Sequence, residues 1–125
     1  QFTRKPRVLT LSSASTIEAA DANYVHQWRD RVESVGNRYY PQHARNNSLY
    51  GDVRLLVKLQ SNGVVEEISI LASSNSEILD RAAIESIRLA SPFDPFPPSL
   101  ANKYDRIDVI RTWQFRKNRL SAKAE

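Results

Sequence analysis

Apolar residues recur at two different periods along the 125-residue chain, and the changes of period mark the predicted elements. Between residues 14 and 37 they recur every three or four positions, the spacing of one helical face. A capping box, Ser15-Thr16-Ile17-Glu18, precedes this stripe and Gly36-Asn37 follows it, so both helix ends are marked. The pattern predicts an amphipathic helix with a packing stripe of Ile17, Ala20, Tyr24, Val25, Trp28, Val32 and Val35.

A short helical element is predicted from Tyr40-Pro41 to Asn46, because proline fits the first turn of a helix. Strict alternation follows over residues 52–60, with Val53, Leu55, Val57 and Leu59 on one face, which predicts a half-buried strand.

Asn62-Gly63 then predicts a hairpin with a type I′ turn. The returning strand is predicted over residues 65–72. Val65 has the opposite parity to Ile68 and Ile70, so we expect a bulge near Glu66-Glu67.

A second amphipathic helix is predicted after Ser73, where Ser74 and Glu77 have the spacing of a capping box. Its buried stripe would consist of Ile78, Leu79, Ala82, Ala83, Ile87 and Ala90. Residues 92–98 hold four of the six prolines and two phenylalanines. We interpret them as a rigid connector anchored by its Phe side chains, in preference to a Pro-rich ligand for another protein.

The last long apolar run, residues 106–116, is rich in β-branched and aromatic residues and predicts a third strand. Ile107, Val109, Trp113 and Phe115 share one face with Arg111. We therefore expect either that Arg111 extends its charged end to solvent or that a bulge re-aims the residues after it.

These elements predict an α+β fold with a three-stranded antiparallel/mixed sheet. A right-handed crossover through the second helix places the third strand beside the first and parallel to the second, in the spatial order 2-1-3. The helices would lie on one face, with the extra N-terminal helix added. Only a short basic tail follows residue 117, so we expect the third strand to be an open sheet edge and the working surface.

Composition narrows the classes of function. The chain is 41% hydrophobic with a formal net charge of +4, contains no Cys or Met, and has no apolar run of the ~18 residues that a membrane helix needs. Because translation starts with Met, we expect a longer parent protein. Moderate basicity suits an anionic partner or simply a solvated surface, and we favour the second.

Catalytic and metal-binding patterns are not apparent in the sequence. His26 and His43 are isolated, and Glu66-Glu67 and Asp105/Asp108 carry no signal of burial. We therefore predict neither an enzyme nor a cofactor or metal site. Nucleic-acid binding through the outer sheet face would require aromatic residues there, whereas the positions expected on that face are Arg54, Lys58, Glu67, Thr112 and Gln114.

Residues 38–117 resemble the C-terminal domain of TonB. The resemblance rests on an ordered set of short motifs: Tyr40-Pro41, Gly51-x-Val53-x-Leu55-x-Val57, Asn62-Gly63-x-Val65, Ser73-Ser74, Leu79-Asp80-x-Ala82-Ala83, Pro92-Phe93-x-Pro95-Phe96-Pro97 and Ile110-x-x-Trp113-x-Phe115. Residues 1–13 have a basic cluster, one Pro and no helical period, and we interpret them as a linker end. With the resemblance, the chain then divides into this linker end (1–13), a helical extension (14–37), the TonB-like domain (38–117) and a basic tail (118–125).

The resemblance implies the periplasmic end of an energy transducer anchored in the inner membrane of a Gram-negative bacterium. Its partners would be the ExbB/ExbD motor complex, through a membrane helix and Pro-rich linker ahead of Gln1, and the TonB box of outer-membrane transporters. The box would add as a strand to the last strand of the domain. The implied partner-binding residues are Asn37, in place of a family Gln, together with Tyr40, Pro41, Asp108, Val109, Ile110, Arg111, Thr112, Trp113, Gln114, Phe115 and Arg116. The alternative is an envelope tethering module of the same family with a partner other than a transporter.

Overall fold

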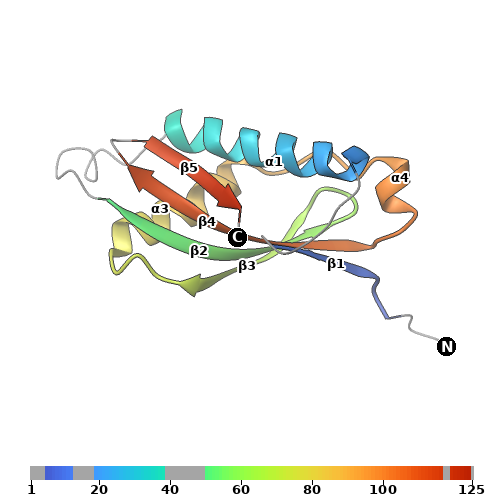
Figure 1. Cartoon of the computed structure of the whole chain (residues 1–125), viewed down its shortest axis with the longest axis horizontal. Coiled ribbons are helices and arrows are strands. Elements are labelled where there is room, and N and C mark those ends of the chain that lie inside the picture. Colours follow the sequence, from blue (N-terminus) through green and yellow to red (C-terminus); the bar gives the residue numbers. More distant parts are fainter. Residues whose placement is uncertain (1–4, 13–18, 39–49, 117–118, 125) are drawn as a thin grey trace.

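The computed structural model describes residues 5–12, 19–38, 50–116 and 119–124, and it forms one α+β unit (Figure 1). Its elements in chain order are β1 (Val8–Leu11), α1 (Ala19–Arg38), β2 (Gly51–Gln60), β3 (Val65–Ala72), α3 (Glu77–Ala90), α4 (Pro98–Ala101), β4 (Arg106–Arg116) and β5 (Arg119–Ala124).

The three expected strands are present in the expected order. β2 lies between β3 and β4 and is antiparallel to both, so β4 runs parallel to β3. The sheet nevertheless has five strands, because β1 and β5 both pair with β4. The expectation of an open β4 edge is therefore wrong. Each added strand is short and comes from a segment that was assigned to the linker end or the basic tail.

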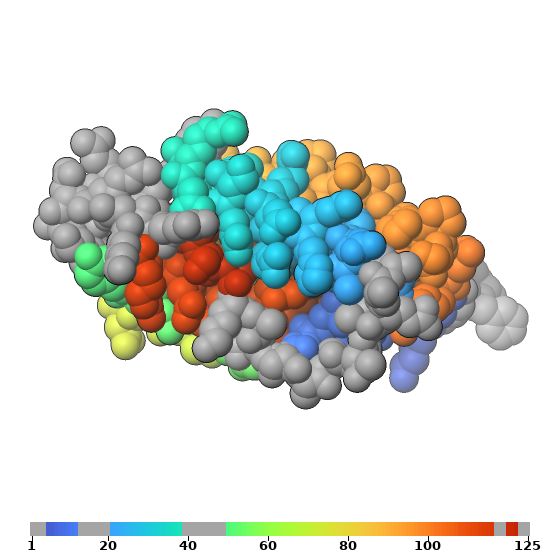
Figure 2. Space-filling view, turned by 45° about the horizontal axis from the view of Figure 1, so that its top comes forward, coloured from blue at the N-terminus to red at the C-terminus, as the bar shows by residue number. Residues whose placement is uncertain are grey.

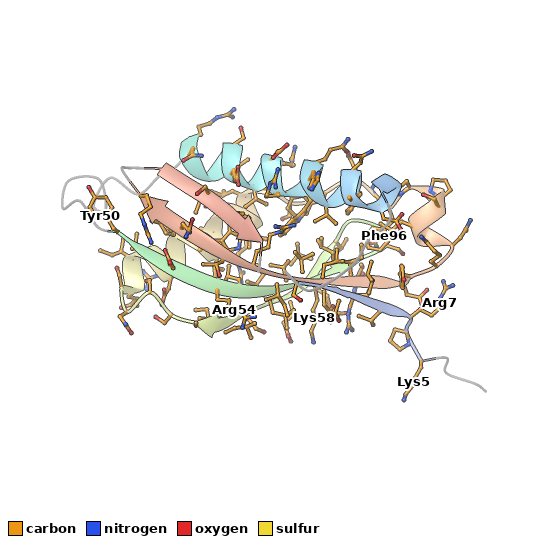
Figure 3. All side chains as sticks on the ribbon, viewed as in Figure 1. Lys5, Arg7, Tyr50, Arg54, Lys58 and Phe96 are labelled. Carbon is orange, nitrogen blue, oxygen red and sulfur yellow. The ribbon has the colours of Figure 1, made fainter. Side chains whose placement is uncertain are left out.

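The two long helices cover one face of the sheet (Figure 1). Val53, Leu55, Val57 and Leu59 of β2 are all at most 1% exposed, which confirms the alternation. The side chains of Arg54 and Lys58 point away from the helices, whereas Phe96 lies on the helix side (Figure 3). The predicted stripe of α3 is confirmed: Leu79, Ala82, Ala83, Ile87 and Ala90 are buried, and Ile78 packs against them.

The β2–β3 hairpin differs from the expected type I′ turn. Gly63 has a φ of +88°, while Asn62 is not among the described residues with positive φ. The Gly63 N–H bonds the Gln60 carbonyl and the Gln60 N–H bonds the Val64 carbonyl, both at 2.9 Å. A three-residue loop with glycine in the left-handed position fits these bonds. The expected bulge is confirmed, because Lys58 pairs with Glu67 and Leu59 with Val65, leaving Glu66 as the extra residue.

The N-cap of α3 is Ser76 rather than Ser74: its side chain accepts a hydrogen bond from the Leu79 N–H. Ser74 instead donates to the Asp80 carboxylate through both its backbone N–H and its hydroxyl. Burial raises the pKa of Asp80, but the hydrogen bonds from Ser73 and Ser74 outweigh it and hold that pKa below its usual value.

The Pro-rich connector is packed, as expected. Phe93 and Phe96 are buried, and their N–H groups bond the carbonyls of Gly63 and Ser61 in the hairpin loop. Tyr24 meets Phe96 edge-on at 5.2 Å between ring centroids. Helix α1 therefore packs against the core through its contact with this connector.

Several expected features lie outside the described residues, namely the Ser15–Glu18 capping box and the element from Tyr40 to Asn46. Within the described ranges, no helix is long and apolar enough to cross a membrane. The same ranges contain no group of three His, Cys, Asp or Glu residues placed to hold a metal ion.

Candidate functional site: the outer side of β4

The outer side of β4 is paired along nearly its whole length. β1 runs parallel to its first residues, with Val8 opposite Arg106 and Leu11 opposite Val109. β5 runs antiparallel to the remainder, from Arg111↔Ala124 to Arg116↔Arg119. Ile110 is the one position of β4 that neither strand pairs in the part of the chain described. The site expected to receive a partner strand thus already holds two short strands of the same chain.

The predicted site residues of β4 divide by face. Val109, Trp113 and Phe115 point into the core and are each 1% exposed, so they support the strand and are not accessible to a partner's side chains. Ile110, Thr112 and Gln114 alternate with them and are half-buried.

Both ends of β4 are held by ion pairs. The Asp108 carboxylate lies 2.7 Å from Arg106 Nε, and Arg116 Nη2 lies 2.6 Å from Asp52 Oδ1. The first pair joins two residues of β4, and the second joins β4 to β2. The Arg116 guanidinium also donates to the carbonyls of Phe115 and Gly51.

The register of β4 against β2 shows whether β4 contains a bulge near Arg111. The ladder with β2 runs without a register shift from Gly51↔Phe115 to Gln60↔Arg106, so β4 contains no bulge against β2. Arg111 therefore stays on the core side, half-buried, with its Nε buried and without a hydrogen-bond partner. Burial lowers the pKa of Arg111, the positive charge of Arg29 lowers it further, and Glu33 partly opposes both. Helix α1 thus lies directly over this part of β4.

β5 is held on its far side by side chains of α1. The Asn37 amide donates to the Leu120 carbonyl at 3.1 Å and accepts from the Leu120 N–H at 2.8 Å. One turn earlier, the Glu33 carboxylate accepts from the Ala122 N–H at 2.8 Å. These side chains fill the places that a further strand's main chain would take. Figure 2 shows β5 beside the C-terminal half of α1.

The side chain of Leu120 packs into the core beneath α1. It is 0% exposed, and a Cβ added to Gly36 would lie 2.4 Å from its Cδ2. The same added Cβ would lie 2.8 Å from Ser86 Oγ on α3. Glycine at position 36 therefore lets α1 approach both β5 and α3 closely.

β1 is held by its preceding residue. The N–H of Arg7 donates to the Asp105 carboxylate at 2.8 Å, and the N–H of Asp105 donates back to the Arg7 carbonyl at 2.8 Å. The Arg7 guanidinium also pairs with the Asp105 carboxylate at 3.0 Å. β1 is thus anchored at one end, outside the stretch of β4 that β5 covers.

Of the sequence-predicted site residues, the structure brings Asn37 and residues 108–116 together around one edge. Tyr40 and Pro41 lie outside the described residues. Sequence reasoning missed Glu33, Gly36 and Leu120. The alternation of Leu120 and Ala122 in the last segment was the available signal, and it is too short to distinguish a strand from a tail.

Comparison with known proteins identifies the family. The family model described as Gram-negative bacterial TonB protein C-terminal matches residues 36–117. Protein TonB of Pseudomonas putida is 33% identical over 94 residues, which are 74% of this chain and 38% of that protein. Protein TonB of Pasteurella multocida (strain Pm70) is 34% identical over 73 residues, 58% of this chain and 28% of that protein. The chain therefore spans well under half the length of these relatives.

Solved structures share the fold. An NMR solution structure of the Helicobacter pylori TonB-CTD aligns with a TM-score of 0.54 at 17% identity, covering 82% of this chain and 96% of that one. A second NMR structure of that domain gives the same TM-score at 20% identity, over 81% and 92% of the two chains. Because the family model covers more than half of the sequence, the chain belongs to the family of Gram-negative bacterial TonB C-terminal domains.

Proposed function

We propose that this chain is the periplasmic end of a TonB-type energy transducer that binds the TonB box of outer-membrane transporters by strand addition to β4. In this proposal the parent protein is anchored in the inner membrane, works with an ExbB/ExbD-type motor complex, and couples the proton-motive force to transport. The observation that carries the proposal is the outer side of β4, which is filled by two separate short strands, β1 with four residues and β5 with six.

A short edge strand is suited to exchange with an incoming strand, because few main-chain hydrogen bonds hold it in place. Removing β5 exposes main-chain groups along residues 111–116, and an extended peptide can satisfy the same groups. Each hydrogen bond gained is worth a net ~0.5–1.5 kcal/mol, and a comparable set of bonds is lost with β5. The exchange is therefore close to balanced, which suits a transient complex that must form and release.

Force would then pass through backbone bonds in the centre of the sheet. β4 lies between β2 and the added strand, and its ladder with β2 is unbroken over its first ten residues. Recognition through the main chain leaves most side-chain positions of the partner strand unconstrained, so one transducer can serve several transporters.

The test is an NMR titration of the 15N-labelled chain with a peptide of a transporter box from the same organism. We expect shifts in amides 108–116 and in β5. A disulfide between Gln114→Cys and Ser121→Cys should abolish them when oxidised. These residues pair directly, at about 5.5 Å between Cα atoms for a hydrogen-bonded pair, which a disulfide can span. The chain has no other cysteine.

The reduced double variant is the matched control and should bind like the unaltered chain. Shifts confined to α1 or β3, or equal binding by the oxidised and reduced forms, would place the contact elsewhere and refute strand addition to β4. No response to any transporter box would instead favour the tethering module with another envelope partner. Co-purification of the full-length parent from envelopes would then identify that partner.

A further inference from the structure

β5 lies in a slot with two walls of different kinds. On one side is the main chain of β4, which pairs with β5 through a regular antiparallel ladder. On the other side are Asn37 and Glu33 of α1, which bond the main chain of Leu120 and Ala122. Because antiparallel ladders alternate, the main chain of Ser121 points to β4 while that of its two neighbours points to α1. The strand in this slot is therefore held along both of its edges.

The core beneath the slot favours particular side chains at two positions of β5. Leu120 is fully buried beneath Gly36 and Ser86, and Ala122, two residues later, is partly buried against the same core. Ser86 is itself buried and donates its hydroxyl proton to the Ala82 carbonyl, so that proton is not available to a carboxylate placed at Leu120. A charged side chain at the position of Leu120 would be desolvated without gaining a partner.

We infer that the slot between β4 and α1 is a strand-binding site that selects for side chains and is occupied by β5. A partner strand must match the side chains of β5 that face the core in order to displace it. The matching partner is an extended segment with a branched apolar residue at the position that Leu120 occupies and a small residue two positions later. Asn37 and Glu33 hold the main chain of whichever strand is present. The inference rests on the proposed function for the identity of the natural partner, but the slot itself can be tested without one.

The experiment uses the whole chain with Ser121→Pro, which removes the N–H that faces β4 and so releases β5 from the slot. The probe is a synthetic peptide of residues 118–125, Asn-Arg-Leu-Ser-Ala-Lys-Ala-Glu. We expect the peptide to bind the S121P chain and to shift the amides of residues 111–116 and the side-chain amide of Asn37. The same peptide with Leu120→Asp should bind at least tenfold more weakly.

The wall on α1 is tested by adding Asn37→Ala to the S121P chain. Loss of two hydrogen bonds should weaken the peptide by about tenfold. Ser34→Ala, at an exposed position of the same helix, is the matched control and should leave the affinity unchanged. Equal binding of the Leu and Asp peptides, or no effect of Asn37→Ala, would overturn the inference.

A measurement in the otherwise unaltered chain covers the case in which S121P does not fold. Asn37→Ala should speed hydrogen exchange of the Leu120 amide at least tenfold without changing that of Val57 in the β2–β4 ladder. Equal exchange with and without Asn37 would overturn the inference. Because neither experiment contains a transporter segment, failure of the transporter titration alone would refute the proposed function and leave the slot standing.

Discussion

Tyr24 is buried where α1 meets the Pro-rich connector, and its hydroxyl donates a 2.7 Å hydrogen bond to the Asp94 carbonyl. Burial, and secondarily the negative charge of Asp94, raises the pKa of Tyr24 to about 12 from an ordinary value of 10.0. The folded state therefore holds this proton more tightly than the unfolded state. Its contribution to stability is complete below pH 10 and is lost as the pH rises toward 12.

Tyr24→Phe should flatten the decline of stability in that alkaline window. The contribution removed is on the order of 2–3 kcal/mol across the window. At neutral pH the variant should be about 1 kcal/mol less stable, because one hydrogen bond is lost. Urea unfolding at a series of pH values measures both effects. Tyr50→Phe, at an exposed position, should keep the original slope, and a Y24F profile parallel to it would contradict the assignment to Tyr24.

The residues that line the strand slot were hard to predict for a physical reason. Alternation reports which side of a strand faces the core, and it identified the buried side chains of β2 and β4. The N–H of Leu120 donates to Asn37 and the N–H of Ala122 donates to Glu33, and these bonds join positions 83 and 89 residues apart. Such contacts depend on the angle at which α1 crosses the sheet, which no local pattern encodes.

Among the elements, the β2–β3 hairpin is fixed by its contact with the Pro-rich connector. Gly63 has a φ of +88°, and a Cβ added there would lie 2.1 Å from the Phe93 carbonyl oxygen. The Phe93 N–H also donates to the Gly63 carbonyl at 3.1 Å. The glycine is thus required by close approach as well as by backbone conformation.

Gly63→Ala should destabilise the chain by at least about 2 kcal/mol, since it combines a left-handed backbone with a clash. Gly63→Asn separates the two causes, because asparagine tolerates positive φ but carries the same Cβ. We expect it to be nearly as damaging as Gly63→Ala in thermal unfolding. Recovery of most of the stability with asparagine would show that backbone conformation, not contact with the connector, decides the residue.

The elements missed from the sequence share one property. β1 has four residues and β5 has six, and each lies near an end of the chain. Short strands are stabilised by the strand they join and have little propensity signal of their own. The long strand at residues 106–116 was predicted with its true bounds, whereas the strands on its outer side required knowledge of that edge.

At the scale of the whole molecule, α1 is part of the core. Trp28 is 3% exposed and meets Phe93 at 5.8 Å and Trp113 at 5.9 Å between ring centroids. Near the start of the helix, the buried Asp21 pairs with Lys103 at 2.6 Å. The matched family region begins at residue 36, so most of α1 precedes it while packing against its connector and its last strand.

Trp28→Ala should therefore lower the free energy of unfolding by about 3–5 kcal/mol, the usual cost of removing a large aromatic side chain from a core. That is a large share of the ~5–15 kcal/mol that holds a typical domain folded, so β4 and β5 should lose hydrogen-exchange protection together with α1. His26→Ala, exposed on the same helix, should change stability by less than about 0.5 kcal/mol. If Trp28→Ala instead cost under about 1 kcal/mol and left β5 protected, α1 would be an appendage, and the slot would have to hold β5 through β4 alone. The packing of α1 and the pairing of β5 with the edge of β4 thus depend on each other, and Trp28→Ala tests both.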